Sequence, residues 1–206
     1  MPLRRSTPSF RTRSGIHLAL RSSFNYLTLI LALTLATAHA DYQSALDAYN
    51  AGKYTTALNE WKAVVEPPPG NVQPAIYAET HYAIGMLYWL GQGVSKDYFE
   101  ASKWLHKAGE LGHAGAQGKL GYLYTEGISV QRDYHQAFQW FSKAAKQGDV
   151  DGQYNLGIFY LNGWGTKQDR TMAAQYLAAA SAQGDEGAET ALRWLLPELA
   201  QKSKMD

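Results

Sequence analysis

The sequence contains no cysteine, which excludes a disulfide-linked framework and any metal site built from thiolates. It also lacks the polar bias of a disordered chain, since 46% of its 206 residues are hydrophobic and only 18% are charged. This composition equally excludes a collagen-like protein. We therefore expect an ordered chain that is held together without covalent cross-links.

Acidic residues are absent from the first 40 positions, which carry five arginines. Without that segment the chain has 14 basic and 18 acidic residues, a formal charge of −4. A protein that binds nucleic acid through the phosphate backbone needs a concentrated basic face. The remaining chain has no such excess, so we expect no nucleic acid partner.

The acid-free start has the layout of a secretory signal peptide. A basic stretch precedes the apolar run 27–36, and Ala38-His39-Ala40 then matches the A-x-A cleavage rule. We expect cleavage between Ala40 and Asp41 and export to the periplasm or the medium. Two alternatives stay open: a translation start downstream of Met1, and an organelle transit peptide. No later apolar run reaches membrane length, so the mature chain is not expected to span a membrane.

A repeat of 36 residues dominates the rest of the chain. Seven columns are identical in three copies, far more than average composition gives by chance. These columns are Gly85/Gly121/Gly157, Tyr88/Tyr124/Tyr160, Gly91/Gly127/Gly163, Asp97/Asp133/Asp169, Ala101/Ala137/Ala173, Ala108/Ala144/Ala180 and Gly112/Gly148/Gly184.

Each copy reads as two helices joined by a loop, with the copies at 80–115, 116–151 and 152–187. The pattern predicts that a left-handed glycine ends the first helix, and that an aspartate caps the second helix at Asp97, Asp133 and Asp169. Glu100 and Gln136 predict a reciprocal capping box in two copies. The mid-helix glycines Gly85, Gly121 and Gly157 predict close approach between helices, which would offset their low helix propensity.

The two ends of the array differ from the repeats. Residues 41–66 predict a divergent helical hairpin, and 67–79 form a proline-rich spacer that leads into the array, with helix resuming near Ala75. Residues 188–206 predict a capping helix over 188–196, followed by Pro197 and a polar tail. Atypical end units are what a stacked array needs to cover its exposed faces.

The shared string Leu-Gly-x-x-Tyr-x-x-Gly, followed by the capping aspartate and then Ala-x-x-Trp-x-x-x-Ala, resembles the Sel-one-like repeat (SLR). This repeat is a tetratricopeptide-like unit, and the divergent first hairpin resembles the exported bacterial members. Ser129 and Tyr176 depart from the pattern, where glycine and tryptophan are usual. The resemblance implies an all-α fold, a right-handed α-solenoid of stacked hairpins, and a role as a scaffold or adaptor for other proteins.

No catalytic motif accompanies the repeats. The four histidines after the leader, His81, His106, His113 and His135, lack H-E-x-x-H spacing, and we interpret them as scattered surface residues. Neither a nucleophile elbow nor S-x-x-K is present. Acid–base work by Asp97 and Glu100 is the weaker alternative to their role as helix caps. We expect no enzyme activity, cofactor or metal site.

By analogy with tetratricopeptide arrays, the first helices line the concave side of the solenoid. Variable residues beside the glycine column could form an apolar, aromatic strip there, suited to a partner helix or extended peptide. The alternative is that they pack against neighbouring helices, as Trp164 in the third loop also could. The candidates are Tyr82, Met86, Trp89, Gly118, Tyr122, Thr125, Tyr154, Ile158 and Leu161.

Two functions remain open. The first is an exported, non-enzymatic scaffold that binds another protein through this concave strip. The second is a cell-wall glycan-binding protein or one active on β-lactams or peptidoglycan, because aromatic strips also stack on sugars. Some cysteine-rich relatives are linked to β-lactam binding, but their paired cysteines have no counterpart here.

Overall fold

The computed structural model describes residues 39–65 and 73–202, and every regular element within these ranges is an α-helix. Residues 1–38 of the predicted leader and residues 66–72 of the hairpin end and spacer lie outside them. The helix that covers residues 39–50 comes first along the described chain. It is followed by α2 (Tyr54–Val65), α3 (Pro74–Leu90), α4 (Tyr98–Glu110), α5 (Ala114–Glu126), α6 (Tyr134–Lys146), α7 (Val150–Asn162), α8 (Arg170–Ser181) and α9 (Glu186–Lys202).

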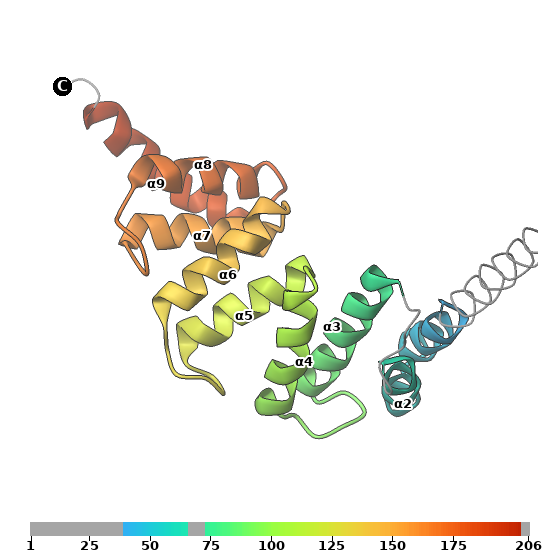
Figure 1. Ribbon diagram of the computed structural model, residues 1–206. Coiled ribbons are helices and arrows are strands. Elements are labelled where there is room, and N and C mark those ends of the chain that lie inside the picture. Colours follow the sequence, from blue (N-terminus) through green and yellow to red (C-terminus); the bar gives the residue numbers. More distant parts are fainter. Residues whose placement is uncertain (1–38, 66–72, 203–206) are drawn as a thin grey trace, which may run out of the picture.

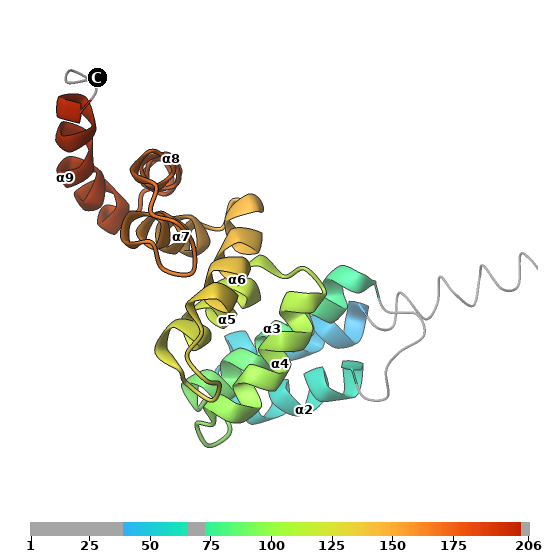
Figure 2. The same cartoon turned by 60° about the vertical axis from the view of Figure 1, so that its left-hand side comes forward.

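The helices follow one another along a curved array, with α2 near one end and α9 at the other (Figures 1 and 2). Each helix packs mainly on its neighbours in sequence, from α2 against α3 to α8 against α9. The buried residues form four successive clusters along the array. This arrangement of stacked hairpins confirms the predicted all-α solenoid.

The mid-helix glycines allow the two helices of each hairpin to come close together. A Cβ on Gly121 would lie 2.6 Å from Cδ1 of Phe141, and one on Gly157 would lie 2.7 Å from Cγ of Leu177. In the first copy the same Cβ on Gly85 would be 3.0 Å from Cγ of Leu105. The large residue of the second helix therefore occupies the space that a side chain would need.

The loops between paired helices have one construction in all three copies. The first glycine of each loop, such as Gly91 with φ of 71°, is left-handed, and its N–H donates to a carbonyl four residues earlier. The capping aspartate then accepts backbone N–H bonds at the start of the second helix, as Asp97 does from Phe99 (2.9 Å) and Glu100 (3.0 Å). These interactions satisfy backbone groups at both helix ends.

The predicted capping boxes are not formed. The backbone N–H of Asp97 donates to the Tyr88 carbonyl at 3.0 Å, and that of Asp133 donates to the Tyr124 carbonyl at 2.9 Å. The first helix thus already supplies the acceptor that the reciprocal side chain would provide. Glu100 is instead paired with Lys103.

The C-terminal helix is longer than expected. α9 runs from Glu186 to Lys202 and includes Pro197, so the prediction that helix stops at residue 196 is wrong. Proline removes one backbone donor, but the residues beyond it still have helical acceptors available. At the other end, α3 begins at Pro74, where the missing N–H costs nothing because the first turn has no intrahelical partner.

Candidate functional site

Among α2 to α9, the first helices of the second and third repeats, α5 and α7, contact each other more extensively than any other helices that are not neighbours in the chain. Between the first two repeats, Trp89 of α3 contacts Tyr122 of α5 on this side. We call the face built by α3, α5, α7 and α9 the inner face.

Trp89 and Tyr122 form the aromatic centre of the inner face. Their ring centroids are 5.9 Å apart with nearly perpendicular planes, and Trp89 also meets the ring of Tyr98 at 5.0 Å. Trp89 is half-buried on the core cluster beneath it, while Tyr122 is 44% exposed. Two candidates from different repeats are therefore brought into one surface, and the solvent-facing part of it is mainly Tyr122.

Tyr82 is held by His113, the N-cap of α5. Its ring is stacked on His113 with centroids 4.1 Å apart and planes 19° from parallel. Burial raises the pKa of the Tyr82 phenol, and the carboxylates of Glu79, Asp149 and Asp151 raise it further. The phenol therefore stays protonated and neutral at physiological pH.

The remaining candidates are more covered. Tyr154, Ile158 and Leu161 are half-buried against the C-terminal cluster, and the Thr125 hydroxyl donates to the carbonyl of Gly121 at 2.8 Å. Met86 is half-buried and Gly118 is buried. Much of the predicted strip is thus covered by packing between repeats. This is the alternative to a binding role that the sequence analysis left open.

Trp164 lies apart from this strip. Its ring stacks on Tyr134 at the start of α6, with centroids 5.3 Å apart, and also meets the edge of Phe159 at 5.6 Å. The loop that carries it is therefore fixed to the preceding repeat. Trp164 joins two hairpins.

The sequence reading missed Trp194 in α9, which is 78% exposed. It lies 36 residues after Ile158, so one further step of the repeat would have found it. The indole forms one wall of a pocket of about 240 Å³ at the end of the inner face, with Leu161, Ala191 and Leu195 among its other walls.

The interpretation of the histidines as surface residues is wrong for three of the four, since only His135 is exposed. His81 is 1% exposed, and its ring lies 4.3 Å from that of Tyr77 and 5.4 Å from that of Trp104. His113 is the N-cap of α5: its Nδ1 accepts from the Ala116 N–H at 3.1 Å. His106 is half-buried, which lowers its pKa because burial disfavours the charged ring.

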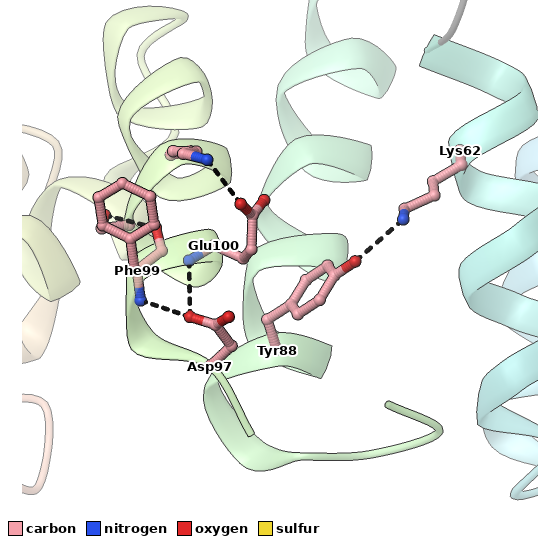
Figure 3. A network of polar contacts seen from close by, with 7 residues as sticks. Lys62, Tyr88, Asp97, Phe99 and Glu100 are labelled. Atoms are coloured by element: carbon pink, nitrogen blue, oxygen red, sulfur yellow. Dashed lines mark hydrogen bonds and ion pairs between the residues drawn. The ribbon is translucent and has the colours of Figure 1, made fainter. Parts of the chain in front are cut away.

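The polar contacts near the first loop are structural (Figure 3). Lys62 Nζ donates to the Tyr88 hydroxyl at 2.9 Å and thereby joins α2 to α3. Asp97 is occupied with capping, and Glu100 is paired with Lys103. In the part of the chain that the structure describes, no three His, Asp or Glu side chains are placed to hold a metal ion.

Among the described residues, no helix is both long and apolar enough to cross a membrane. The profile of the Sel1 repeat matches residues 78–113, 114–149 and 150–185. These copies begin two residues before those defined by the glycine columns. No curated protein matches the sequence significantly.

Two solved structures are similar to this chain. A Sel1 repeat protein from Oxalobacter formigenes is 34% identical with a TM-score of 0.53, over 56% of this chain and 87% of its own. The second is c5321 of uropathogenic Escherichia coli, described as a protective antigen with an SLR fold. It is 25% identical with a TM-score of 0.56, over 81% of this chain and 43% of its own. The chain thus spans less than half of that antigen.

Proposed function

This chain belongs to the Sel1 repeat family, and we propose that it is an exported scaffold, without enzyme activity, that binds a segment of another protein on its inner face. Sel1 repeat proteins are generally non-catalytic and mediate protein interactions. On the inner face, the aromatic side chains of Tyr122 and Trp194 remain open to a partner. Aromatic residues of this kind dominate the energetics of protein interfaces.

The observation that carries the proposal is the pair of exposed rings on this face. Tyr122 is 44% exposed although it sits at the centre of the array, and Trp194 is 78% exposed beside the pocket. Exposed rings of this size are costly to leave in water, and a partner that covers them gains the corresponding hydrophobic free energy. The pocket, which Asn162, Gln168 and Arg170 also line, would take one side chain of the bound segment.

The test is a comparison of binding between variants of the purified protein. Displayed random 12-residue peptides are selected on the wild type, and affinities of the selected peptides are measured for Tyr122→Ala and Trp194→Ala. Each variant is expected to lose at least about tenfold in affinity, since truncating a central aromatic commonly costs more than 1 kcal/mol. Circular dichroism checks that helicity is unchanged.

Phe99→Ala is the matched control. Phe99 is 58% exposed on α4, a second helix, so its removal takes away a similar exposed ring from outside the inner face. Affinity should stay within about twofold of the wild type. Equal loss in all three variants, or none in any, would remove the inner face as the binding surface.

The same experiment separates the scaffold from the glycan-binding alternative. The protein is incubated with peptidoglycan and sedimented, with and without a selected peptide. We expect no co-sedimentation and no turnover of a chromogenic β-lactam. Sedimentation that the Trp194→Ala variant abolishes would favour the glycan-binding function instead.

Export rests on the leader pattern in residues 1–40. Cell fractionation followed by N-terminal sequencing should find the protein outside the cytoplasm, beginning at Asp41. A cytoplasmic protein that keeps its first 40 residues would contradict this part of the proposal.

A further inference from the structure

The residue that precedes the first helix of a unit changes its chemical type at one place in the array. Asp149 and Asp185 precede α7 and α9, and each carboxylate accepts the backbone N–H three residues later, at 2.7 and 2.6 Å. In the same column before α5 stands His113, whose ring Nδ1 accepts from the Ala116 N–H at 3.1 Å. α5 therefore begins with a cap of a residue type that takes up a proton near neutral pH.

His113 also contacts α3. Its Nε2 donates to Oε2 of Glu79 at 2.9 Å, and its ring stacks on Tyr82 with centroids 4.1 Å apart. The first turn of α5 packs against the same ring, since a Cβ on Gly115 would lie 3.3 Å from Cε1 of His113. The side chain is 17% exposed, so a proton from solvent can reach it. The imidazole thus joins α3 to the first turn of α5.

A proton on Nδ1 would act on these contacts in opposite directions. An imidazolium has no acceptor nitrogen, so the hydrogen bond from the Ala116 N–H cannot form. Its positive charge would also lie at the N-terminus of α5, where the helix dipole disfavours a cation. The ionised carboxylate of Glu79 and the face of the Tyr82 ring, in contrast, both attract a cation. Protonation thus removes the contact with α5 and strengthens the two contacts with α3.

We infer that His113 is a pH-sensitive joint between the first two repeats: when Nδ1 gains a proton, the ring stays on α3 and releases the first turn of α5. The charge of histidine ordinarily changes between pH 5 and 8, whereas aspartate ordinarily stays ionised down to about pH 4. The response is therefore confined to one of three equivalent joints. It goes beyond the proposed function, because it does not depend on what the protein binds.

Charged groups from four helices can influence the ring of His113. Glu79 contacts the ring directly, and the carboxylates at the start of α7 act on the phenol of Tyr82, which is stacked on it. The acidic groups are Glu79 on α3, Glu110 on α4, and Asp149 and Asp151 at the start of α7; the basic groups are Lys107 on α4 and Lys119 on α5. Glu79 is therefore the group to change when the pH of the response is tested.

Nuclear magnetic resonance of the purified protein can follow both sides of this joint between pH 8 and pH 5. The ring nitrogens of His113 report protonation of Nδ1, and the backbone amide of Ala116 reports the cap. Both signals should change with one midpoint. Hydrogen exchange of the Ala116 amide, corrected for the intrinsic pH dependence of exchange, should become about fivefold faster, the factor expected for loss of a typical cap. The amides of Gly152 and Ala188, which aspartates cap, are internal controls and should not change.

Two variants separate the proton on His113 from other effects of pH. Asparagine caps a helix well and does not titrate in this range, so His113→Asn should abolish the response of Ala116. Glu79→Gln removes the negative charge that attracts the imidazolium but keeps an acceptor for Nε2, so the midpoint should move to lower pH. Circular dichroism at pH 8 checks that both variants keep the helicity of the wild type.

Several results would overturn the inference. The ring of His113 could stay neutral down to pH 5, or it could take up its proton while the Ala116 amide does not respond. An equal response at Gly152 and Ala188, or an unchanged response in His113→Asn, would show that pH acts elsewhere. Each of these results leaves the proposed function standing, because peptide binding tests that separately.

Discussion

At the scale of single residues, the glycine column explains why the hairpins are so similar. Gly85, Gly121 and Gly157 each face one large side chain of the paired helix, and that side chain is fully buried in every copy. The sequence shows that three glycines recur. The structure adds the partner that makes them necessary.

Gly121→Ala should destabilise the protein by about 1–3 kcal/mol. Its Cβ would lie 2.6 Å from the Phe141 ring, and the resulting overpacking outweighs the helix propensity that alanine gains. Chemical denaturation monitored by circular dichroism measures the change. The loss should shrink in a Phe141→Leu background, where the side chain is smaller; an equal loss in both backgrounds would contradict this explanation.

Ser129→Gly should stabilise the protein by roughly 0.5–1 kcal/mol. Among the residues that the structure describes, Ser129 is the one non-glycine residue with a positive φ, which is 60°. Glycine adopts this conformation without a steric penalty. The other two loops have Gly93 and Gly165 at this position, also with positive φ. Ser95→Gly, in the loop of the first repeat, is the control and should give no stabilisation. A lower melting temperature for Ser129→Gly would show that the serine has another role.

Buried polar residues were the part of the residue-level prediction that failed. His81 shares a column with Gln117 and Gln153, and all three are buried. A search for identical columns passes over such positions, because the residue type varies while the environment stays the same. Trp194 was missed for a related reason: the helix that carries it departs from the repeat elsewhere.

At the scale of the helix, capping decides where each element begins. The first helices of three successive units begin directly after His113, Asp149 and Asp185. The side chain of each of these residues accepts a hydrogen bond from the backbone N–H three residues further along the chain. Since Nδ1 of His113 is the acceptor, Nε2 carries the proton and donates to Glu79 at 2.9 Å. This contact joins α3 to α5.

The contribution of Glu79 to stability should be lost at low pH. The hydrogen bond from His113 is the main cause that lowers the pKa of Glu79, so the folded state favours the ionised carboxylate. The stability that ionised Glu79 contributes is fully present above the usual carboxyl pKa of about 4.3. It disappears as the pH falls through the lowered pKa of Glu79 in the folded state. Urea denaturation should show Glu79→Gln less stable than the wild type at pH 6 and equally stable near pH 2. A difference that persists at pH 2 would point to packing instead.

A pair of glutamines couples successive hairpins. Nε2 of Gln147 donates to the Gly112 carbonyl at 2.9 Å and to Oε1 of the buried Gln117 at 2.8 Å. Gln183 repeats this arrangement one unit later, with Gly148 and Gln153.

Gln147→Ala should destabilise the protein by about 1–3 kcal/mol, because it leaves a buried acceptor without a donor. Thermal unfolding measures this loss. Gln139→Ala is the control, because Gln139 is exposed on α6, the helix that Gln147 caps, and its side chain is hydrogen-bonded to His135, one turn before it. Equal effects of the two substitutions would contradict a coupling role for Gln147.

At the scale of the whole molecule, the periodic sequence predicts the solenoid because every copy has the same local contacts. Each hairpin buries its apolar side on its neighbours, as the four successive core clusters show. The binding surface is harder to predict. Whether a residue such as Tyr154 faces a partner or the next repeat depends on how tightly adjacent units pack, and that is not encoded in any one column.

Hydrogen exchange of the protein with and without a selected peptide tests the central claim most directly. Binding on the inner face should slow exchange in α3, α5, α7 and α9, with little change in α4 and α6, the second helices of the first two repeats. Protection confined to α4 and α6, or to the loops that join the hairpins, would contradict the account.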